Sequence, residues 1–457
     1  MTSTLEQPKS VVTEQEMTEC SSGFDVRPSG RSKVVLSRTK RLSSEHSELY
    51  MTELPQNETE EESLQNISTR DVTTSNKVNN KSIRNKKKKN LEQSDVKREI
   101  YKRECAKCHV VPVGAYLRTP SSGSLVIRHY NLGPNGAKAL SAPLMLDDTV
   151  THVDIVGNAI EVQGLVFLLQ ALADNRSVQH LDISDNNLTS TGAKVLGDFI
   201  RTNKNTTLEN LIMSENCFKD EDGLYFAEAI QENKSLKEIV LSHNLFGDVS
   251  GPAFGKALAV NSTLETFDIS WNQIRQKSAA LFVKRLKANV GLTRLNVGFN
   301  GLGSEGATEM VSLLKTNKSL LELDLSHNRL KDLDTVPLAK GLAKNSTLKV
   351  LRIGDNLLTS VGATAILHSL YDPLSVCVLQ TLDFHNTSVD LAFERYLKEI
   401  KVDRNINVIH GKIMTVGDPP QPTKTYIRVK ARDKKSKEDQ RNKAKTTSGI
   451  NTMTTKR

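Results

Sequence analysis

The stretch "FDISWNQI" at residues 267–274 alternates apolar and polar side chains up to an asparagine, and an isoleucine follows two residues later. The same pattern recurs through the centre of the chain, and its asparagines are 28 residues apart except for one spacing of 30. The other copies are "VDIVGNAI" (153–160), "LDISDNNL" (181–188), "LIMSENCF" (211–218), "IVLSHNLF" (239–246), "LNVGFNGL" (295–302), "LDLSHNRL" (323–330) and "LRIGDNLL" (351–358). Weaker copies flank the series at 125–132 and 382–389. A fixed period of this length predicts a repeat architecture.

Each copy predicts a short strand that is followed by a helix. Phe267 and Ile269 should point into the interior, and the residues between and beside them should face outward. The second half of a unit, exemplified by residues 304–319, places apolar residues along one helical face: Ala307, Met310, Val311 and Leu314. The motif L-x-L-x-x-N-x-L is that of leucine-rich repeats. Each unit can bury its apolar side only against its neighbours, so we predict an α/β solenoid of about ten 28-residue repeats. A parallel sheet should line its concave face, and helices its convex face.

The asparagine of the motif ends each strand. Its amide can satisfy backbone groups of the loop that follows, so successive asparagines should form a ladder along the solenoid. The predicted ladder consists of Asn158, Asn186, Asn216, Asn244, Asn272, Asn300, Asn328 and Asn356.

A second set of asparagines lies in the same phase and matches the N-x-S/T glycosylation string. We expect no glycosylation, because no signal peptide precedes these residues. Their phase places them at the ends of the predicted helices, where asparagine tolerates the left-handed conformation. They are Asn175, Asn233, Asn261, Asn317 and Asn345.

Composition divides the chain into five parts. Residues 1–94 are rich in Ser, Thr, Glu, Asn and Lys with almost no aromatic residues, which predicts disorder. Residues 95–123 should form an N-terminal helical cap, 124–390 the repeats and 391–415 a C-terminal cap that closes the edge of the sheet. Residues 416–457 are expected to be a disordered basic tail.

The net charge of +9 is a property of the tail. Residues 421–457 carry 12 basic and 3 acidic side chains, whereas residues 1–100 have a net charge of +1 and residues 101–420 a net charge of −1. Basicity therefore does not mark the repeats as a nucleic-acid-binding surface. Five cysteines are too few and odd in number for a disulfide framework. Without a signal peptide or a long apolar run, we expect a cytoplasmic protein. Nuclear import through the basic segments is an alternative.

Several segments outside the core motif resemble those of a known group of proteins. Tyr101 and Cys105 are followed by "VVPVGAYLR" (110–118) and "NLGPNGAKAL" (131–140), which lead into the repeats. With the 28-residue period, the chain resembles ribonuclease-inhibitor-like leucine-rich repeat proteins, and most closely the leucine-rich repeat-containing protein 74 family. The resemblance implies an intracellular horseshoe with no established catalytic activity. The chain departs from ribonuclease inhibitor in having few Cys and Trp residues, and from Ran GTPase-activating proteins in having a basic rather than an acidic tail.

One short string has the residue types of a metal or haem site. Cys105, Cys108 and His109 form C-x-x-C-H, which matches covalent haem attachment, and zinc ligation with His129 is a second alternative. The simpler interpretation is a cap helix with one or two buried thiols. We expect no metal and no cofactor.

The residue just before each asparagine should lie at the rim of the concave face. In the central repeats this residue is His243, Trp271, Phe299 or His327, and strands about 4.8 Å apart should bring the four rings into contact. Neighbouring outward positions on these repeats carry polar and charged residues: Asp268, Asn296, Asp324 and Arg294. Such a cluster is typical of a binding hot spot. The alternative is that Trp271 merely shields the asparagine ladder.

No catalytic triad, paired-carboxylate site or complete phosphate loop is present in the sequence. The sequence therefore favours a monomeric, non-enzymatic scaffold whose concave face binds a protein partner, without a small-molecule substrate or a membrane. One alternative is a domain that regulates a GTPase. The other is an RNA-binding or ribosome-assembly factor that uses the basic tail.

Overall fold

The computed structural model describes the chain from the first cap to the second. The described residues are 95–118, 123–202, 207–372 and 374–415. The expectations of disorder for residues 1–94 and 416–457 lie outside the described residues. Within them, the chain alternates between short strands and helices, as predicted.

One parallel sheet runs through all the repeats. Its eleven strands are hydrogen-bonded in the order β1 to β10 followed by β12. They are β1 (Ser124–Val126), β2 (His152–Asp154), β3 (His180–Asp182), β4 (Asn210–Ile212), β5 (Glu238–Val240), β6 (Thr266–Asp268), β7 (Arg294–Asn296), β8 (Glu322–Asp324), β9 (Val350–Arg352), β10 (Thr381–Phe384) and β12 (Asn407–His410). Phe267 is in register with Ile239 on one side and with Leu295 on the other. Equivalent positions of successive repeats therefore align in columns across the sheet.

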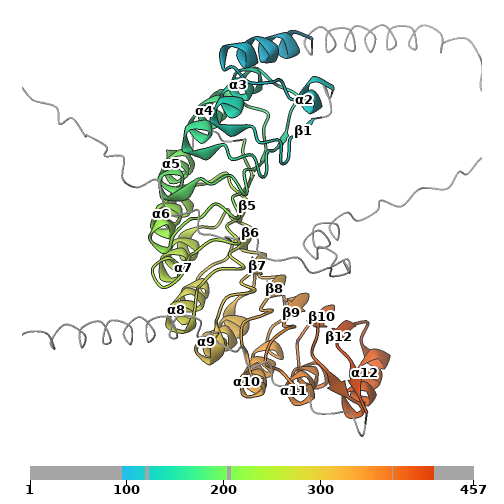
Figure 1. The fold of residues 1–457 in the computed structure, drawn as a ribbon. Coiled ribbons are helices and arrows are strands. Elements are labelled where there is room, and N and C mark those ends of the chain that lie inside the picture. The colour runs from blue at the N-terminus through green and yellow to red at the C-terminus, as the bar shows by residue number, and fades with distance from the viewer. Residues whose placement is uncertain (1–94, 119–122, 203–206, 373, 416–457) are drawn as a thin grey trace, which may run out of the picture. The chain divides into compact units, whose positions relative to one another are not determined.

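The helices of the repeats cover one side of this sheet (Figure 1). They are α3 (Gly133–Met145), α4 (Glu161–Asp174), α5 (Thr189–Thr202), the 3₁₀ turn η1 (Asp220–Asp222), α6 (Gly223–Glu232), α7 (Ser250–Val260), α8 (Gln276–Leu286), α9 (Gly303–Thr316), α10 (Asp332–Leu342) and α11 (Ser360–Tyr371). A helix at 95–107 and α2 (Gly114–Arg118) precede them, and α12 (Leu391–Asp403) follows. The opposite side of the sheet is here called the strand face. None of the described helices is long and apolar enough to cross a membrane. The chain is an α/β leucine-rich repeat solenoid.

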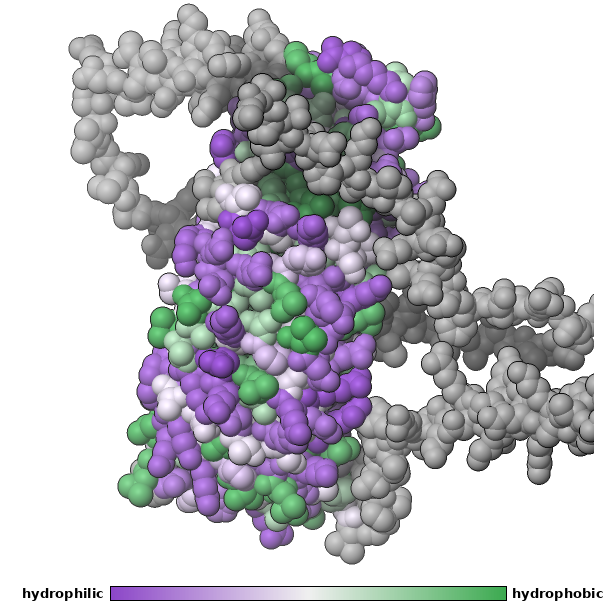
Figure 2. All heavy atoms as spheres, turned by 90° about the vertical axis from the view of Figure 1, so that its left-hand side faces the viewer, coloured by the Kyte–Doolittle hydropathy of each residue, from purple (hydrophilic) through white to green (hydrophobic). Residues whose placement is uncertain are grey.

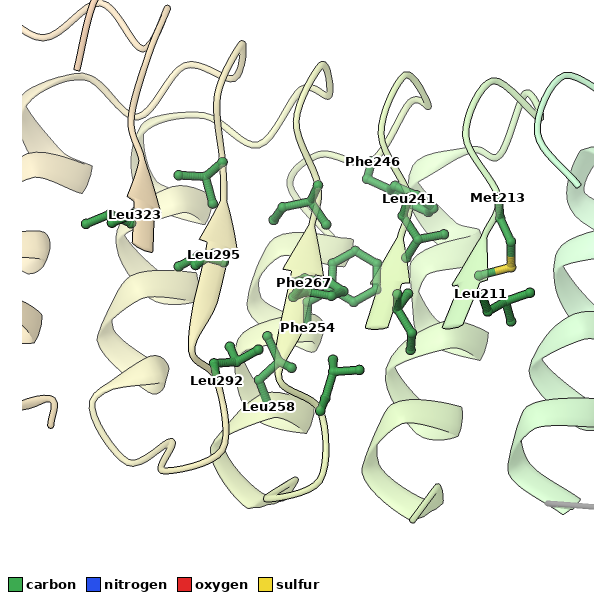
Figure 3. Close-up of a cluster of buried hydrophobic side chains, with 14 of the residues drawn as sticks. Leu211, Met213, Leu241, Phe246, Phe254, Leu258, Phe267, Leu292, Leu295 and Leu323 are labelled. Carbon is green, nitrogen blue, oxygen red and sulfur yellow. The ribbon is translucent and has the colours of Figure 1, made fainter. Parts of the chain in front are cut away.

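The core fills the space between the sheet and the helices. Phe254 of α7 lies edge-on to Phe267 of β6 with ring centroids 5.5 Å apart, and Phe246 lies 5.3 Å from Phe254. Figure 3 shows these rings among aliphatic side chains from neighbouring repeats, including Leu241 and Leu295. Burial of each such side chain contributes about 1.5–3 kcal/mol. Because these contacts join different repeats, much of the apolar stabilisation is shared between neighbours.

The asparagines of the motif are hydrogen-bonded from repeat to repeat, and all except the half-buried Asn356 are buried. The Nδ2 group of Asn272 donates to the carbonyl of Leu241 in the preceding repeat and to those of Ile269 and Ser270 in its own, each at 3.1 Å. Its Oδ1 accepts from the backbone N–H of Phe246 at 3.0 Å. Equivalent bonds are made by Asn158, Asn186, Asn216, Asn244, Asn300, Asn328 and Asn356. Each asparagine thus joins two strands and the loop between them.

The asparagines at the helix ends form a second ladder, and the expected left-handed conformation was wrong. Four of them have extended backbones with φ between −69° and −81°: Asn175, Asn233, Asn261 and Asn317. The Nδ2 of Asn261 donates to the carbonyls of Ile230 and Asn233, and its Oδ1 accepts from the N–H groups of Thr263 and Leu264. The extended backbone turns the chain from the helix towards the next strand. The side-chain amide pairs with backbone carbonyls at the end of the preceding repeat's helix and with backbone N–H groups that follow its own helix.

A buried ion pair holds the N-terminal cap. The Nζ of Lys97 in the helix at 95–107 donates to Oδ1 of Asp147 at 2.7 Å, and both side chains are buried. Burial by itself would raise the pKa of Asp147, but the hydrogen bonds from Lys97 and Thr149 outweigh this effect and hold the pKa below its ordinary value. The pair therefore ties the cap helix to the loop after α3.

The C-terminal cap continues the sheet by one strand. The carboxylate of Asp390 accepts from the N–H of Phe393 and caps α12. The strand β12 then pairs with β10, within the segment predicted to close the sheet edge. A two-stranded sheet of β11 (Val389–Asp390) and β13 (Ile413–Met414) lies beside the start of α12.

We expect Asn272→Ala to lower the free energy of unfolding by about 1–3 kcal/mol, because it leaves buried backbone carbonyls and an N–H without partners. Urea denaturation of the full-length protein measures this change. Gln273→Ala, at the exposed neighbouring position, should change the free energy by less than about 0.5 kcal/mol. Equal denaturation midpoints for the two variants would contradict a structural role of the ladder.

We expect Lys97→Met to destabilise the N-terminal cap by about 3–5 kcal/mol, because it leaves the buried Asp147 carboxylate without its cation. Hydrogen–deuterium exchange should accelerate in residues 95–118 and stay unchanged in residues 238–268.

The same cap should loosen at acid pH in the unchanged protein. A carboxyl whose pKa is lowered by folding adds stability above its unfolded pKa of about 4, and this stability is lost as the pH falls through the lower folded pKa. Exchange in residues 95–118 should therefore rise below about pH 4 in the wild type more than in Lys97→Met. A Lys97→Met protein with wild-type cap exchange would show that the pair does not hold the cap.

Candidate functional site

The column of residues just before the ladder asparagines has an unusual backbone. His243, Trp271, Phe299 and His327 all lie in the left-handed region, with φ between 53° and 55°. Large side chains seldom adopt this region, which costs about 1–2 kcal/mol for an L residue. The backbone N–H of Trp271 donates to the carbonyl of Gly298 in the next repeat at 3.0 Å, and that of Phe299 makes the same bond one repeat later. The ladder of hydrogen bonds therefore holds these residues in their strained conformation.

The structure brings the four rings together in sequence, as the strand spacing predicts. The ring of His243 lies 4.8 Å from that of Trp271 with an interplanar angle of 15°. Trp271 and Phe299 are stacked at 3.5 Å, and Phe299 and His327 at 3.6 Å. These four side chains are here called the ring stack.

Polar contacts extend the ring stack along the same column. The Nε2 of His327 lies 3.1 Å from Oδ2 of Asp355, the residue at the equivalent position of the next repeat. The amide of Asn386 donates to the other oxygen of Asp355 at 3.0 Å. The rim thus carries a continuous row of six touching side chains, in which the aromatic part occupies the middle repeats.

Trp271 is not a core residue. Its side chain is 46% exposed, whereas the apolar residues of the same repeat, Phe267, Ile269 and Ile274, are buried. His243 and Phe299 stack on the two faces of the indole ring, so the part of Trp271 that is open to solvent is its edge. A surface of this kind can accept an apolar or aromatic group from a partner.

The polar residues predicted beside the ring stack lie on the strand face. Asn296 donates through Nδ2 to Oδ2 of Asp268 at 2.8 Å, and Oδ1 of Asp268 accepts from the N–H of Ser270 at 2.8 Å. Asp324 accepts from the N–H of Ser326 in the same way. These three side chains form the row next to the rim.

The carboxyl groups of this row are held in an unfavourable environment. Burial raises the pKa of Asp268, and the negative charge of Asp324 adds to the increase. Burial also raises the pKa of Asp324, and Asp383 adds to it, although Arg352 opposes the change. Because burial and like charges disfavour the ionised carboxyl groups of this row, a cation bound beside them would stabilise the ionised form.

Arg294 is exposed at the start of β7, in register with Glu322 on β8. The guanidinium of Arg352 lies 3.4 Å from the carboxylate of Glu322. Arg294 is thus on the strand face but two positions further from the rim than Asn296. Arg294 lies on the predicted face, and it is not one of the side chains that stack with His243, Trp271, Phe299 or His327.

A second aromatic pair on the strand face was missed by the sequence reasoning. His152 and His180, at equivalent positions of consecutive repeats, stack with centroids 4.0 Å apart. Burial lowers the pKa of His180, and His152 lowers it further. Nearby, Arg128 donates to the carboxylate of Asp154 at 2.6 Å. The sequence signal for this pair is two histidines 28 residues apart, each at the first position of its repeat strand.

The C-x-x-C-H string forms part of the cap. Cys105 is buried, and burial raises the pKa of its thiol, which disfavours the thiolate that binds metals. Tyr101, which interacts with this thiol, uses its hydroxyl to accept from the N–H of Val113 at 3.1 Å. Among the described residues no three His, Cys, Asp or Glu side chains are arranged to hold a metal ion. The predicted alternatives with zinc or haem therefore find no support in the arrangement of Cys105, Cys108 and His109.

The opposite side of the molecule has a different surface. Figure 2 views the helix side, which is mainly hydrophilic, with separate hydrophobic side chains between polar ones. The exposed apolar residues of the helices include Leu224, Leu281 and Val361, which are aliphatic. Leu281 is as exposed as Trp271, at 46%, and is a matched reference for mutational tests.

We expect Phe299→Gly to be more stable than Phe299→Ala by about 0.5–1 kcal/mol. Glycine adopts the left-handed backbone of this position without steric cost, and alanine does not. Thermal or urea unfolding of both variants measures the difference. At Leu281, within α8, the order should be reversed, since glycine is about 1 kcal/mol less favourable than alanine in a helix. The same order at both positions would contradict backbone strain in the ring stack.

Two comparisons relate the chain to known proteins. Six segments match the family model described as "Leucine Rich repeat": residues 174–197, 204–227, 260–282, 289–311, 316–339 and 344–367. Leiomodin-1 Actin-Binding Site 2 is 21% identical over 32% of this chain and 85% of that chain, with a TM-score of 0.29. The tropomodulin C-terminal domain of Caenorhabditis elegans is 14% identical over 34% of this chain and 92% of that chain, also with a TM-score of 0.29. The six matched segments carry the leucine-rich repeat pattern, in agreement with the repeating strand–helix architecture of the solenoid.

Proposed function

We propose that this protein is a non-enzymatic scaffold that binds a protein partner on its strand face, with Trp271 and Phe299 as the anchors. The observation that carries the proposal is the half-exposed ring stack in a strained backbone conformation. The left-handed backbone recurs at this position in the other repeats, for example at Asp185 and Glu215, so the aromatic side chains and not the strain distinguish this site. The resemblance to the leucine-rich repeat-containing protein 74 family agrees with an intracellular interaction protein, and we propose membership of that family as well.

The rigidity of the ring stack favours binding. Each ring is held between its neighbours, and its backbone N–H is bonded to the next repeat. A partner therefore meets side chains whose conformational entropy is already low, so less affinity is lost when they are immobilised. Tryptophan is also among the residues most often found as hot spots in protein interfaces.

The alternative role, shielding of the asparagine ladder, agrees less well with the other repeats. Glu215 and Asp185 occupy the position of Trp271 two and three repeats earlier, and the adjacent Asn216 and Asn186 are fully buried all the same. The ladder is thus covered without an aromatic residue before it. The rings therefore require a different explanation, and partner binding supplies one.

The polar surroundings indicate the kind of partner. Asp268 and Asp324 lie beside the rings, and burial, with a smaller contribution from a neighbouring carboxylate, raises the pKa of each. A partner with an apolar or aromatic group for the rings and a lysine or arginine for the carboxylates would fit this face. A nucleic acid would be repelled by the same carboxylates.

We expect Trp271→Ala, alone or with Phe299→Ala, to weaken partner binding by at least about 2 kcal/mol, which is about 30-fold in Kd. Thermal stability should change by less than about 1 kcal/mol. Quantitative affinity capture with full-length protein identifies proteins that the wild type retains and Trp271→Ala loses. Titration of each purified candidate then gives the Kd.

The matched control is Leu281→Ala, an equally exposed position on α8 of the same repeat. It should retain the same proteins as the wild type. Loss of a candidate from both variants would assign its binding to another surface. A partner whose Kd is unchanged by the double Trp271→Ala and Phe299→Ala substitution would contradict the anchor proposal.

A further inference from the structure

The strand face carries more negative than positive charge. The first and third residues of each repeat strand point to this face, because the middle residue is buried in the core. In the described strands these positions hold seven carboxylates: Asp154, Asp182, Glu238, Asp268, Glu322, Asp324 and Asp383. The guanidinium groups at the same positions are those of Arg294 and Arg352.

The carboxylates near the ring stack are only partly compensated. Asp268 accepts its recorded hydrogen bonds from the amide of Asn296 and the backbone of Ser270, both of which are neutral. Asp324 accepts from the backbone of Ser326. Burial and the neighbouring carboxylates raise the pKa of both groups. A cationic segment placed here would offset the repulsion between the carboxylates, and the carboxylates would attract it.

A segment of this same chain has the complementary charge. Residues 421–457 carry 12 basic and 3 acidic side chains. Ten of the basic residues lie within 424–445, a stretch that begins "KTYIRVKAR" and places Tyr426, Ile427 and Val429 among the charges. The segment thus combines cations for the carboxylates with an aromatic ring and aliphatic groups for the exposed rings of the strand face.

The segment is long enough to reach these carboxylates. The described chain ends at Thr415, directly after β13, in the cap that also contains β12. In the sheet, β6 is five strands from β12, or about 24 Å at 4.8 Å per strand. The nine residues 416–424 span about 30 Å when fully extended. Residue 424 can therefore reach β6, and the 22 residues of 424–445, about 70 Å when fully extended, are more than long enough to bring their cations to the carboxylates between β6 and β10.

We propose that residues 424–445 bind the strand face of their own chain, across Asp268 and Asp324, and cover the ring stack until a partner displaces them. Covalent connection gives the segment an effective concentration on the order of millimolar, so a weak affinity is sufficient for occupancy. Binding of the tail requires the negative charge of the strand face and the positive charge of residues 424–445. It does not require that an outside partner be found.

Trp271 supplies the measurement, because it is the only tryptophan of the chain and lies in the surface to be covered. Its fluorescence should be quenched by acrylamide, a neutral quencher that is insensitive to local charge. The test variant is the full chain with the ten Lys and Arg residues of 424–445 replaced by Gln. We expect at least twofold stronger quenching in this variant than in the wild type at low salt. Raising the salt from about 50 mM to 500 mM should remove the difference.

A synthetic peptide of residues 421–457 tests competition for the same face. It should protect Trp271 in the test variant, and bind the wild type at least tenfold more weakly, because the tail of the wild type already occupies the site. Asp268→Asn with Asp324→Asn in the test variant should weaken the peptide at least fivefold. Glu228→Gln with Glu232→Gln, on the helix α6, is the matched control and should leave peptide binding unchanged.

A further control replaces the four lysines at 86–89 by Gln in the full chain and should not alter quenching. Equal quenching of the wild type and the test variant would overturn the proposal. Equal peptide affinity for these two proteins would also overturn it, and would indicate a face that takes basic segments only from other molecules. Partner capture with Trp271→Ala is measured separately. Failure of the tail to bind would leave the partner-anchor proposal intact, and failure to find a partner would leave the tail proposal intact.

Discussion

The asparagine ladder is the interaction on which the rest of the structure depends. A strand of three residues is too short to be stable alone, and each repeat exposes unpaired backbone groups where its strand ends. The amide of each ladder asparagine satisfies groups of its own repeat and of the preceding one. Since the same bond recurs at every repeat, the register of the sheet and the spacing of the loops are set together.

The candidate site follows from this constraint. The residue before each asparagine adopts a left-handed backbone so that its N–H can donate to the next repeat. Its side chain is thereby placed on the rim at the spacing of the strands, which is close to the stacking distance of aromatic rings. Where the chain places His243, Trp271, Phe299 and His327 in this column, stacking is the consequence. The scaffold and the proposed anchor are thus produced by one set of hydrogen bonds.

The carboxylates of the strand face bear on both of the proposed binding functions. Apolar burial and the ladders stabilise the repeats, whereas burial and neighbouring carboxylates raise the pKa values of Asp268 and Asp324 on the strand face. Such groups are a cost to stability that a bound cation can remove. The proposed partner and the basic segment of the chain itself are therefore expected to use the same electrostatic imbalance.

By itself, the sequence determined the repeat period, the parallel sheet, the asparagine ladder and the rings that meet, because equal positions in neighbouring strands must lie one strand spacing apart. Only the tertiary structure decided the backbone of the rim, the extended asparagines at the helix ends and the buried pair of Lys97 and Asp147. It also decided that Asp220 accepts from the N–H of Gly247 and of Ser250 in the next repeat. These features lie outside the repeated motif and depend on which groups approach each other between repeats, and a one-dimensional pattern carries no such distances.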